Sequence, residues 1–224
     1  MDNKPICSCC SGKKSGTHEL IQHWDNTYNK VETEKLGWYE ENPQPSLRLI
    51  NKCNLAEDAA ILNVGAGSTT LIDELLKLKY TNIIANDISS NAFDILKKRI
   101  GRDSQNVKFL IDDITLPYEL AKLEKVDLWH DRAVLHFFTD KNEQNAYFDL
   151  LRKLVVKNGY VIIAVFNLNG ATKCSGLPVC RYDENMLHLK LGPDFKLIEA
   201  FNHTYIQPSG NPREFIYTLF KRIN

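Results

Sequence analysis

Apolar residues follow two patterns along the chain: short continuous runs, and longer stretches in which they recur every three or four positions. The short runs predict strands buried on both faces, and the longer stretches predict amphipathic helices. Strands are expected at residues 59–64, 82–86, 107–111, 126–130 and 160–166. Helices are expected at residues 69–78, 90–100 and about 142–155. Such alternation of strand and helix implies a parallel sheet with right-handed crossovers.

The end of the chain departs from this alternation. Two strand-like runs, at residues 195–205 and 214–221, flank the turn-forming segment 207–212, which contains two prolines and a glycine. That segment leaves no room for a helix, so the two runs should pair antiparallel. The expected fold class is α/β: a doubly wound, Rossmann-like sheet of five parallel strands plus a C-terminal antiparallel hairpin. Helices should cover both faces of these seven strands.

The N-terminal region should add helices in front of the first strand. Residues 18–30 predict a helix with Trp24 and Tyr28 on one face, and Ser46 predicts the cap of a second helix. Residues 1–17, rich in Lys, Ser, Gly and Cys, are interpreted as a flexible tail, which leaves residues 18–224 as the domain.

The turn after the first strand carries a candidate ligand site. Gly65, Ala66 and Gly67 bring the backbone close to a ligand at the start of a helix, whose free N–H groups can hold polar groups. Asp87 follows Gly67 by 20 residues, the usual interval for a carboxylate that accepts from ribose hydroxyls. The other role considered for Asp87 is a helix cap. Thr70 stands where a dinucleotide fingerprint has its third glycine, so a nucleoside cofactor is favoured over a dinucleotide.

The segment Leu62-Asn63-Val64-Gly65-Ala66-Gly67-Ser68 resembles the first motif of class I S-adenosylmethionine-dependent methyltransferases, although that family usually has Asp or Glu where this chain has Asn63. The resemblance extends over about residues 20–221. It implies S-adenosyl-L-methionine as cofactor and S-adenosyl-L-homocysteine as product. It also implies that Ile88 packs on the adenine and that Asp113, beside Ile114, meets the adenine amino group.

Aromatic residues of the N-terminal region could cover the cofactor's sulfonium by cation–π contact, or simply anchor the first helix. The cofactor-binding residues expected from the motifs and the resemblance are Trp24, Tyr28, Tyr39, Asn63, Gly65, Ala66, Gly67, Asp87, Ile88, Asp113, Ile114 and His130.

The run Trp129-His130-Asp131-Arg132 ends the fourth expected strand. Polar groups there are costly to bury without partners. His130 is the candidate catalytic base, because an unperturbed imidazole titrates near neutrality, and Asp131 would orient it as the second catalytic residue. The competing interpretation is a structural ion pair between Asp131 and Arg132. His136, one turn on, is expected to pack against the phenylalanines that follow it.

Two further resemblances bear on the methyl acceptor. Residues 129–132 and 174–182 resemble segments of a group of uncharacterised bacterial class I methyltransferases, and residues 174–182 are interpreted as a lid. The N-terminal half also resembles the methyltransferase-like lysine methyltransferases that act on translation elongation factor 1A, through Trp24-Asp25-x-x-Tyr28 and Trp38-Tyr39. After the fourth strand those enzymes carry Asp/Glu-Lys-Gly-Thr-Leu-Asp, which this chain lacks.

The leading hypothesis is therefore methyl transfer to the nitrogen, oxygen or sulfur of a small molecule. A protein lysine methyltransferase is the alternative, and a non-catalytic relative, suggested by Asn63, is the second alternative.

Composition limits partners and compartment. Lys plus Arg and Asp plus Glu are both 28, so no global charge attracts nucleic acid or a membrane surface. No apolar run reaches the length of a membrane span, and no signal peptide is apparent, so a cytoplasmic location is expected. The cluster Cys7, Cys9 and Cys10 lacks a second pair of ligands, so no metal is expected.

Overall fold

Seven strands form one sheet in the computed structural model, which describes residues 16–224. Their order is β3-β2-β1-β4-β5-β9-β8. The strands are β1 (Ile61–Val64), β2 (Ile83–Asp87), β3 (Val107–Ile111), β4 (Val126–Arg132), β5 (Val155–Phe166), β8 (Phe195–Ile206) and β9 (Pro212–Arg222). The first five are parallel, whereas β9 runs antiparallel to both β5 and β8. The predicted fold class is thus confirmed. The cysteines Cys7, Cys9 and Cys10 lie outside the described residues.

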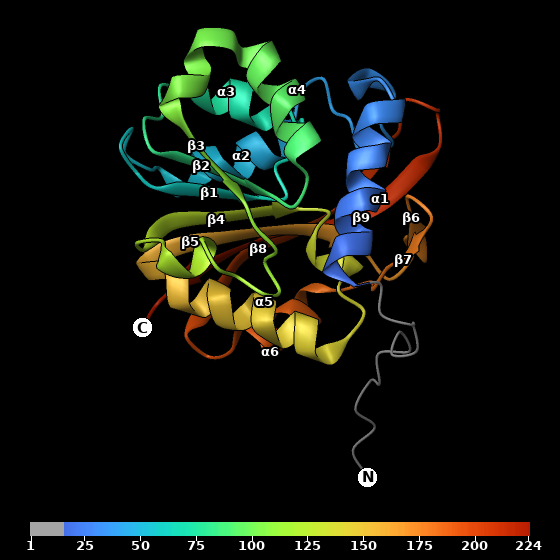
Figure 1. Ribbon diagram of the computed structural model, residues 1–224. Coiled ribbons are helices and arrows are strands. Elements are labelled where there is room, and N and C mark those ends of the chain that lie inside the picture. Colours follow the sequence, from blue (N-terminus) through green and yellow to red (C-terminus); the bar gives the residue numbers. More distant parts are fainter. Residues whose placement is uncertain (1–15) are drawn as a thin grey trace.

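Helices cover both faces of this sheet (Figure 1). The α-helices are α1 (Thr17–Lys30), α2 (Gln44–Cys53), α3 (Leu71–Lys77), α4 (Ser90–Ile100), α5 (Lys141–Leu154) and α6 (Glu184–Leu191). Short 3-10 helices are η1 (Thr33–Lys35), η2 (Gly101–Asn106), η3 (Leu120–Lys122) and η4 (Leu135–Phe137). A separate two-stranded sheet joins β6 (Lys173–Cys174) to β7 (Leu177–Pro178). Within residues 16–224, none of these helices combines the length and the apolar character that crossing a membrane requires.

The hydrophobic core is split by the sheet into two layers. One layer packs α2, α3 and α4 on the sheet, and the other packs α5 and α6 (Figure 1). Leu71 and Leu75 of α3 are buried as their spacing predicts. The same spacing predicts that Leu78 points inward, but Leu78 is 43% exposed because α3 ends at Lys77. The helix α6 and the β6–β7 hairpin are not among the elements expected from the sequence.

The helix α1 lies across the carboxyl ends of the parallel strands (Figure 1). It begins at Thr17, within the expected tail, because the Thr17 hydroxyl donates a 2.9 Å hydrogen bond to Asp113 beyond β3. Farther along α1, Asp25 accepts from the Ser89 hydroxyl at 2.5 Å, and Ser89 itself caps α4. These side chains fix α1 over the loops that follow β2 and β3.

The entry of α2 differs from the expectation. Pro43 occupies the N-cap position and α2 begins at Gln44, so Ser46 lies inside the first turn and does not cap the helix. The Ser46 side chain is fully buried and faces His130 of β4.

The bond between Asp25 and Ser89 generates a stability prediction. Replacing Asp25→Ala should lower the free energy of unfolding by about 1–2 kcal/mol, because a charge-assisted bond between α1 and α4 is lost at a partly exposed site. Urea titration followed by circular dichroism measures this change. Asp58→Ala, at an exposed carboxylate, is the matched control and should change stability by under about 0.5 kcal/mol. Equal effects of the two substitutions would contradict the docking role of Asp25.

Candidate functional site

Two cavities open at the carboxyl ends of the strands, where ligands bind in open α/β sheets. The larger has a volume of about 210 Å³ and the smaller about 40 Å³. Trp38, Gly65 and Arg132 line both, so the cavities adjoin at these residues. Of the expected site residues, the larger cavity is lined by Trp24, Tyr28, Gly65, Asp87, Ile88, Asp113 and Ile114. The smaller is lined by Tyr39, Asn63, Gly65, Ala66 and His130.

The glycine turn after β1 has the conformation that only glycine adopts readily. Gly65 and Gly67 both have a φ of +55°. A Cβ atom at Gly65 would collide with the Val134 side chain, and one at Gly67 would collide with the Tyr28 hydroxyl. Neither position can therefore carry a side chain without displacing residues of the cavity wall.

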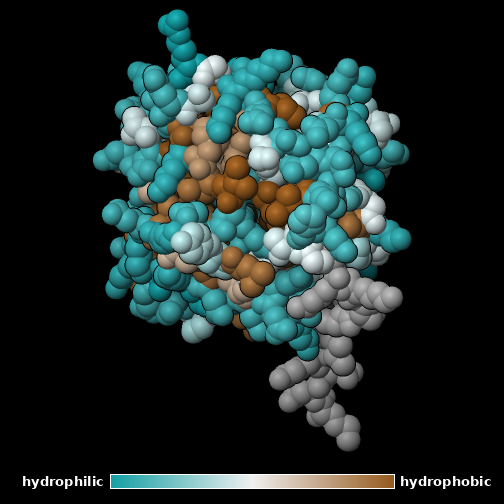
Figure 2. Space-filling view, in the orientation of Figure 1, coloured by the Kyte–Doolittle hydropathy of each residue, from teal (hydrophilic) through white to brown (hydrophobic). Residues whose placement is uncertain are grey.

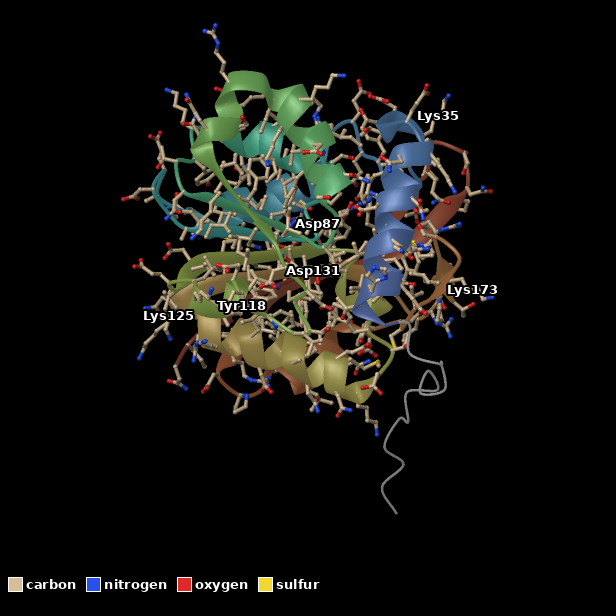
Figure 3. All side chains as sticks on the ribbon, in the orientation of Figure 1. Lys35, Asp87, Tyr118, Lys125, Asp131 and Lys173 are labelled. Atoms are coloured by element: carbon tan, nitrogen blue, oxygen red, sulfur yellow. The ribbon has the colours of Figure 1, made fainter. Side chains whose placement is uncertain are left out.

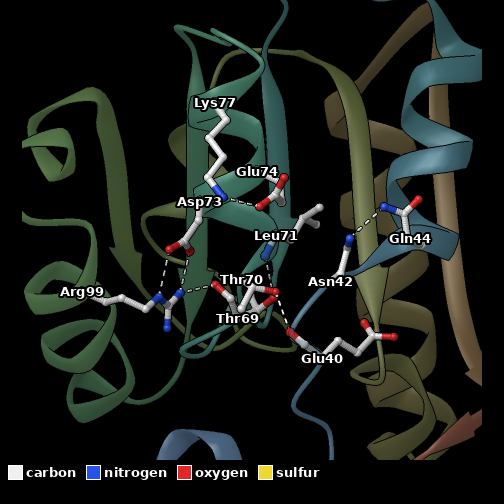
Figure 4. A network of polar contacts seen from close by, with 10 residues as sticks. All are labelled: Glu40, Asn42, Gln44, Thr69, Thr70, Leu71, Asp73, Glu74, Lys77 and Arg99. Atoms are coloured by element: carbon white, nitrogen blue, oxygen red, sulfur yellow. Dashed lines mark hydrogen bonds and ion pairs between the residues drawn. The ribbon is translucent and has the colours of Figure 1, made fainter.

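Arg99 of α4 holds the segment just after this turn (Figure 4). Its guanidinium donates to the carbonyl oxygens of Ser68 and Thr69, each at 2.6 Å, and pairs with Asp73 at 2.7 Å. On the other side, the Thr70 hydroxyl donates to the Glu40 carbonyl at 2.7 Å. Arg99 and Thr70 together fix the start of α3, and Thr70 also fixes the segment that carries Glu40.

Asp87 ends β2 with a buried side chain whose oxygens accept from two backbone amides. One oxygen accepts from Gly67 N and the other from Ser89 N, both at 2.8 Å. Burial raises the pKa of Asp87 to about 6, although the amide donors of Ser89 and Gly67 oppose this shift. Ser89, rather than Asp87, caps α4, so the capping interpretation of Asp87 does not apply.

The neighbouring carboxylates Asp112 and Asp113 have different partners. Asp112 accepts from the backbone amides of Tyr118 and Leu120 and so folds the loop that follows β3. Asp113 accepts from Thr17 and from Thr115 and lines the larger cavity. Asp113 is accordingly tied to α1, and Asp112 to its own loop.

His130, the expected catalytic base, is not among the residues that line the larger cavity. Its ring is 2% exposed and lines only the smaller cavity of the two. Nδ1 lies 3.0 Å from Asn63 Oδ1 and Nε2 lies 2.9 Å from Ser46 Oγ. Burial, and then the charge of Arg132, lower the pKa of His130 to about 3, so the ring is neutral with both nitrogens engaged. This arrangement leaves no free nitrogen for a proton from an acceptor.

Asp131 faces the opposite side of β4 from His130, because successive side chains of a strand alternate between its faces. It is fully buried at the end of β4, and Figure 3 labels it together with Asp87. Its oxygens accept from Val134 N at 2.9 Å, Leu135 N at 3.0 Å and the Tyr147 hydroxyl at 2.7 Å. Burial raises the pKa of Asp131 to about 6 despite these donors. These hydrogen bonds mean that Asp131 fixes the loop after β4.

The proposed ion pair between Asp131 and Arg132 is not formed. Arg132 pairs instead with Glu40 at 2.9 Å and donates to the Tyr217 hydroxyl and the Trp38 carbonyl, each at 3.0 Å. Its Nη2 is buried without a partner among the described residues. Sequence reasoning missed Glu40, since nothing local marks it. The only available signal was that a buried arginine requires a carboxylate from elsewhere.

The rest of the larger cavity has an aromatic and apolar wall. Trp24 contacts Trp38 and Phe137 edge to face, with ring centroids 5.7 and 5.1 Å apart. The β6–β7 hairpin contributes Cys174, Leu177 and Pro178. The thiol of Cys174 is protonated at neutral pH, because burial raises its pKa.

His136 and the segment 174–182 were also singled out in the sequence. His136 is fully buried against Phe137, as expected, and lines neither cavity. The expected lid at residues 174–182 does reach the larger cavity, through its hairpin.

Known proteins resemble this chain in sequence and in fold. A family profile described as "Methyltransferase domain" matches residues 61–159. EEF1A lysine methyltransferase 2 of zebrafish, Danio rerio, is 26% identical over 168 residues, which cover 69% of this chain and 70% of that protein.

The fold itself recurs in solved methyltransferase structures. An S-adenosylmethionine-dependent methyltransferase from Anabaena variabilis superposes with a TM-score of 0.76 at 13% identity, covering 96% of this chain and 98% of that one. The 1,6-didemethyltoxoflavin-N1-methyltransferase of Burkholderia thailandensis, solved with 1,6-didemethyltoxoflavin and S-adenosylhomocysteine, gives 0.68 at 16% identity, covering 96% and 93%.

The hydrogen bonds of Asp131 to Tyr147 and to the loop after β4 lead to a second stability prediction. Tyr147→Phe should lower the free energy of unfolding by about 1–3 kcal/mol, because a buried carboxylate loses a donor and Trp129 Nε1 loses its acceptor. Chemical denaturation at pH 7.5 gives the value. Tyr118→Phe, at a ring 69% exposed, serves as the control and should be close to neutral. Loss of stability in the control alone, or in neither variant, would contradict the assigned role of Asp131.

Proposed function

We propose that this chain, which matches a methyltransferase domain profile over residues 61–159 and shares the fold of S-adenosylmethionine-dependent methyltransferases, transfers the methyl group of that cofactor to a nucleophilic atom of a small molecule held in the larger cavity. The observation that carries this proposal is the composition of the cavity wall. Segments far apart in the sequence, from α1, η4 and the β6–β7 hairpin, converge on it. A cavity walled on several sides suits a compact acceptor better than an extended chain.

The residues at the strand ends fit the cofactor. Asp87 would accept from the ribose hydroxyls, with Ile88 and Ile114 against the adenine and Asp113 near its amino group. All four residues line the larger cavity. The glycines of the turn let Val134 and Tyr28, two residues of the larger cavity's wall, pack directly against the backbone of the turn. When bound, the cofactor supplies a methyl group already activated on a sulfonium, so the protein chiefly orients the reactants and excludes water.

Aromatic side chains suit the acceptor side of this reaction. Trp24, Trp38 and Phe137 offer apolar contact, and a ring face turned to the cavity would stabilise a positive charge near the transferred methyl group. The same wall carries the carboxylates of Asp140 and Glu143. Since Arg132, the only positively charged residue among the described lining residues, already pairs with Glu40, the wall favours an uncharged or cationic acceptor.

The proton of the acceptor requires a different route from the one expected at His130. That ring is neutral, fully engaged and outside the larger cavity. We therefore propose that the acceptor reacts as a free amine, which is uncharged and needs no base from the protein. If a proton must be removed, the Asp140 and Glu143 carboxylates are the acidic side chains on the aromatic wall.

A protein lysine acceptor is the second candidate function, and two observations favour it. The zebrafish relative is named as a lysine methyltransferase. Moreover, three exposed hydrophobic residues lie at the end of the edge strand β3 and in the loop after it, close in sequence to Asp112 and Asp113 of the cavity: Ile111, Leu116 and Tyr118, at 53%, 70% and 69% exposure. Figure 2 shows hydrophobic side chains across the middle of this face, which a protein substrate could cover.

One transfer assay separates these functions. The protein is incubated with methyl-labelled S-adenosylmethionine and three acceptor pools: small amines, thiols and carboxylic acids; recombinant elongation factor 1A; and a total protein extract. Label in the first pool, which contains the small molecules, supports the small-molecule proposal if Phe137→Ala reduces it at least tenfold at constant cofactor affinity. Label confined to a lysine of a protein pool overturns it in favour of the second candidate.

The pKa of Asp87 generates a binding prediction. The raised pKa of about 6 means that the carboxyl group is protonated below that pH and is then a poorer acceptor for two ribose hydroxyls. The affinity for S-adenosylhomocysteine should therefore rise from pH 5 to pH 6.5, by up to about tenfold per pH unit below pH 6, and level off above pH 7. Isothermal titration across this range measures the profile.

Asp87→Asn is the matched control for that profile. The amide cannot ionise, so this variant should bind weakly and with no slope between pH 5 and pH 7. A slope that persists in Asp87→Asn would belong to another group, with Asp131 the foremost candidate because its pKa is also about 6.

A further inference from the structure

The strand β3 ends the sheet on one side, and its outer edge is open. Within the described residues, β3 pairs with β2 alone, so no strand lies beyond it (Figure 1). The pairing is regular along all five residues of β3, with no bulge. A regular edge of this kind presents backbone N–H and C=O groups to which another strand can bind, and proteins usually protect such edges.

The opposite edge strand, β8, carries the usual protection. Its pairing with β9 is interrupted by a register shift between Leu197 and Glu199. Glu199 also pairs with Arg48 and Lys52 of α2, so charged side chains lie along this edge. By contrast, β3 ends in Ile111, whose side chain is 53% exposed. Since bulges and charges discourage pairing between edges, β3 is the edge that is left open to a partner.

The hydrogen bonds between β2 and β3 determine which backbone groups face outward. Asp112 N donates to the Asp87 carbonyl oxygen at 3.0 Å. The Leu110 carbonyl oxygen also faces β2, because it accepts from a side chain of that strand. Backbone groups of successive residues in a strand point to opposite sides, so those of Phe109 and Ile111 point away from the sheet.

A second copy of the same strand can satisfy these outward groups. In an antiparallel pair centred on Leu110 of both copies, Phe109 of one copy lies opposite Ile111 of the other. The N–H and C=O groups of these two residues then bond to each other in both directions. Their side chains also form a favourable cross-strand pair, which joins an aromatic ring to a β-branched residue.

The same register brings opposite charges together. Lys108 of each copy lies opposite Asp112 of the other, and neither residue forms an ion pair within residues 16–224. Lys108 is exposed, and Asp112 accepts from the backbone amides of Tyr118 and Leu120. Centring the pair one residue earlier or later would place an apolar residue opposite Lys108. Because unlike charges stabilise a cross-strand pair, charge favours the register centred on Leu110.

We propose that the chain forms a two-fold dimer in which the β3 strands of two copies pair antiparallel about Leu110 and join the two sheets into one. The larger cavity lies close to this interface, since Asp112 and Asp113, which directly follow β3, line it. The dimer goes beyond the proposed function and does not depend on which acceptor is methylated.

Sedimentation velocity of the full chain tests the association. Between about 1 and 100 µM, the protein should pass from a monomer to twice the 25.7 kDa mass of one chain, as expected for a small interface with a Kd of about 10 µM. Lys108→Glu should weaken the dimer about tenfold or more, because both ion pairs become repulsive. Lys196→Glu, at an exposed position of β8, is the matched control and should leave the Kd within about twofold. A protein that stays monomeric at about 100 µM, or equal effects of the two variants, would overturn the proposal.

A disulfide tests the register. Directly opposite residues of a non-hydrogen-bonded antiparallel pair have Cα atoms about 4.5 Å apart, which a disulfide can span. Leu110→Cys should therefore cross-link two copies under mild oxidation. Lys108→Cys, which lies opposite Asp112 rather than itself, should cross-link no more than the unmodified protein. Cross-linking of both variants alike, or of neither above the unmodified protein, would contradict the register.

Hydrogen exchange separates a second copy from another occupant of this edge. The amides of Phe109 and Ile111 should exchange more slowly at about 100 µM than at about 1 µM protein, because the dimer protects them. Amides that slow only when recombinant elongation factor 1A is added would assign the edge to an extended segment of a protein substrate and overturn the dimer. Circular dichroism of each variant confirms that the fold is retained.

Discussion

The alternation of side chains along β4 is the constraint on which the site depends. Successive residues of a strand point to opposite faces, so the polar run at the end of β4 cannot act as one cluster. Trp129 and Asp131 face α5 and bond to Tyr147, whereas His130 and Arg132 face α2 and the N-terminal segment. One face thereby shapes the loop after β4, and the other face forms the smaller cavity.

On each face of β4, the buried polar side chains pair with residues that are far away in the sequence. Asp131 is satisfied by two amides of the following loop and by a tyrosine from α5, which places Val134 against Gly65. Arg132 pairs with Glu40 and donates to Tyr217, which joins the N-terminal segment to β9. Because a buried charge without partners is costly, these contacts lock together segments that are far apart in the sequence. The rigid floor that results is what an orientation-dependent reaction requires.

The helix α1 completes the site from above. Thr17 and Asp25 fix it to the loops after β3 and β2, and Trp24 and Tyr28 turn toward the cavity. The cavities therefore combine the loops of a doubly wound sheet with an N-terminal helix and a small hairpin that add the remaining wall.

The sheet, the strand ends and the loops that carry Gly65, Asp87 and Asp113 can be predicted from the residues alone, because the hydrophobic period and the placement of glycines are local properties. Most of the expected cofactor residues line the two cavities for the same reason. The tertiary structure alone decided the role of the run at residues 129–132, since each of its side chains finds a partner at a distance: Ser46, Glu40, Tyr147 and Tyr217. The wall of the larger cavity also depends on the tertiary structure, because α1, η4 and the β6–β7 hairpin meet only after the sheet has brought them together.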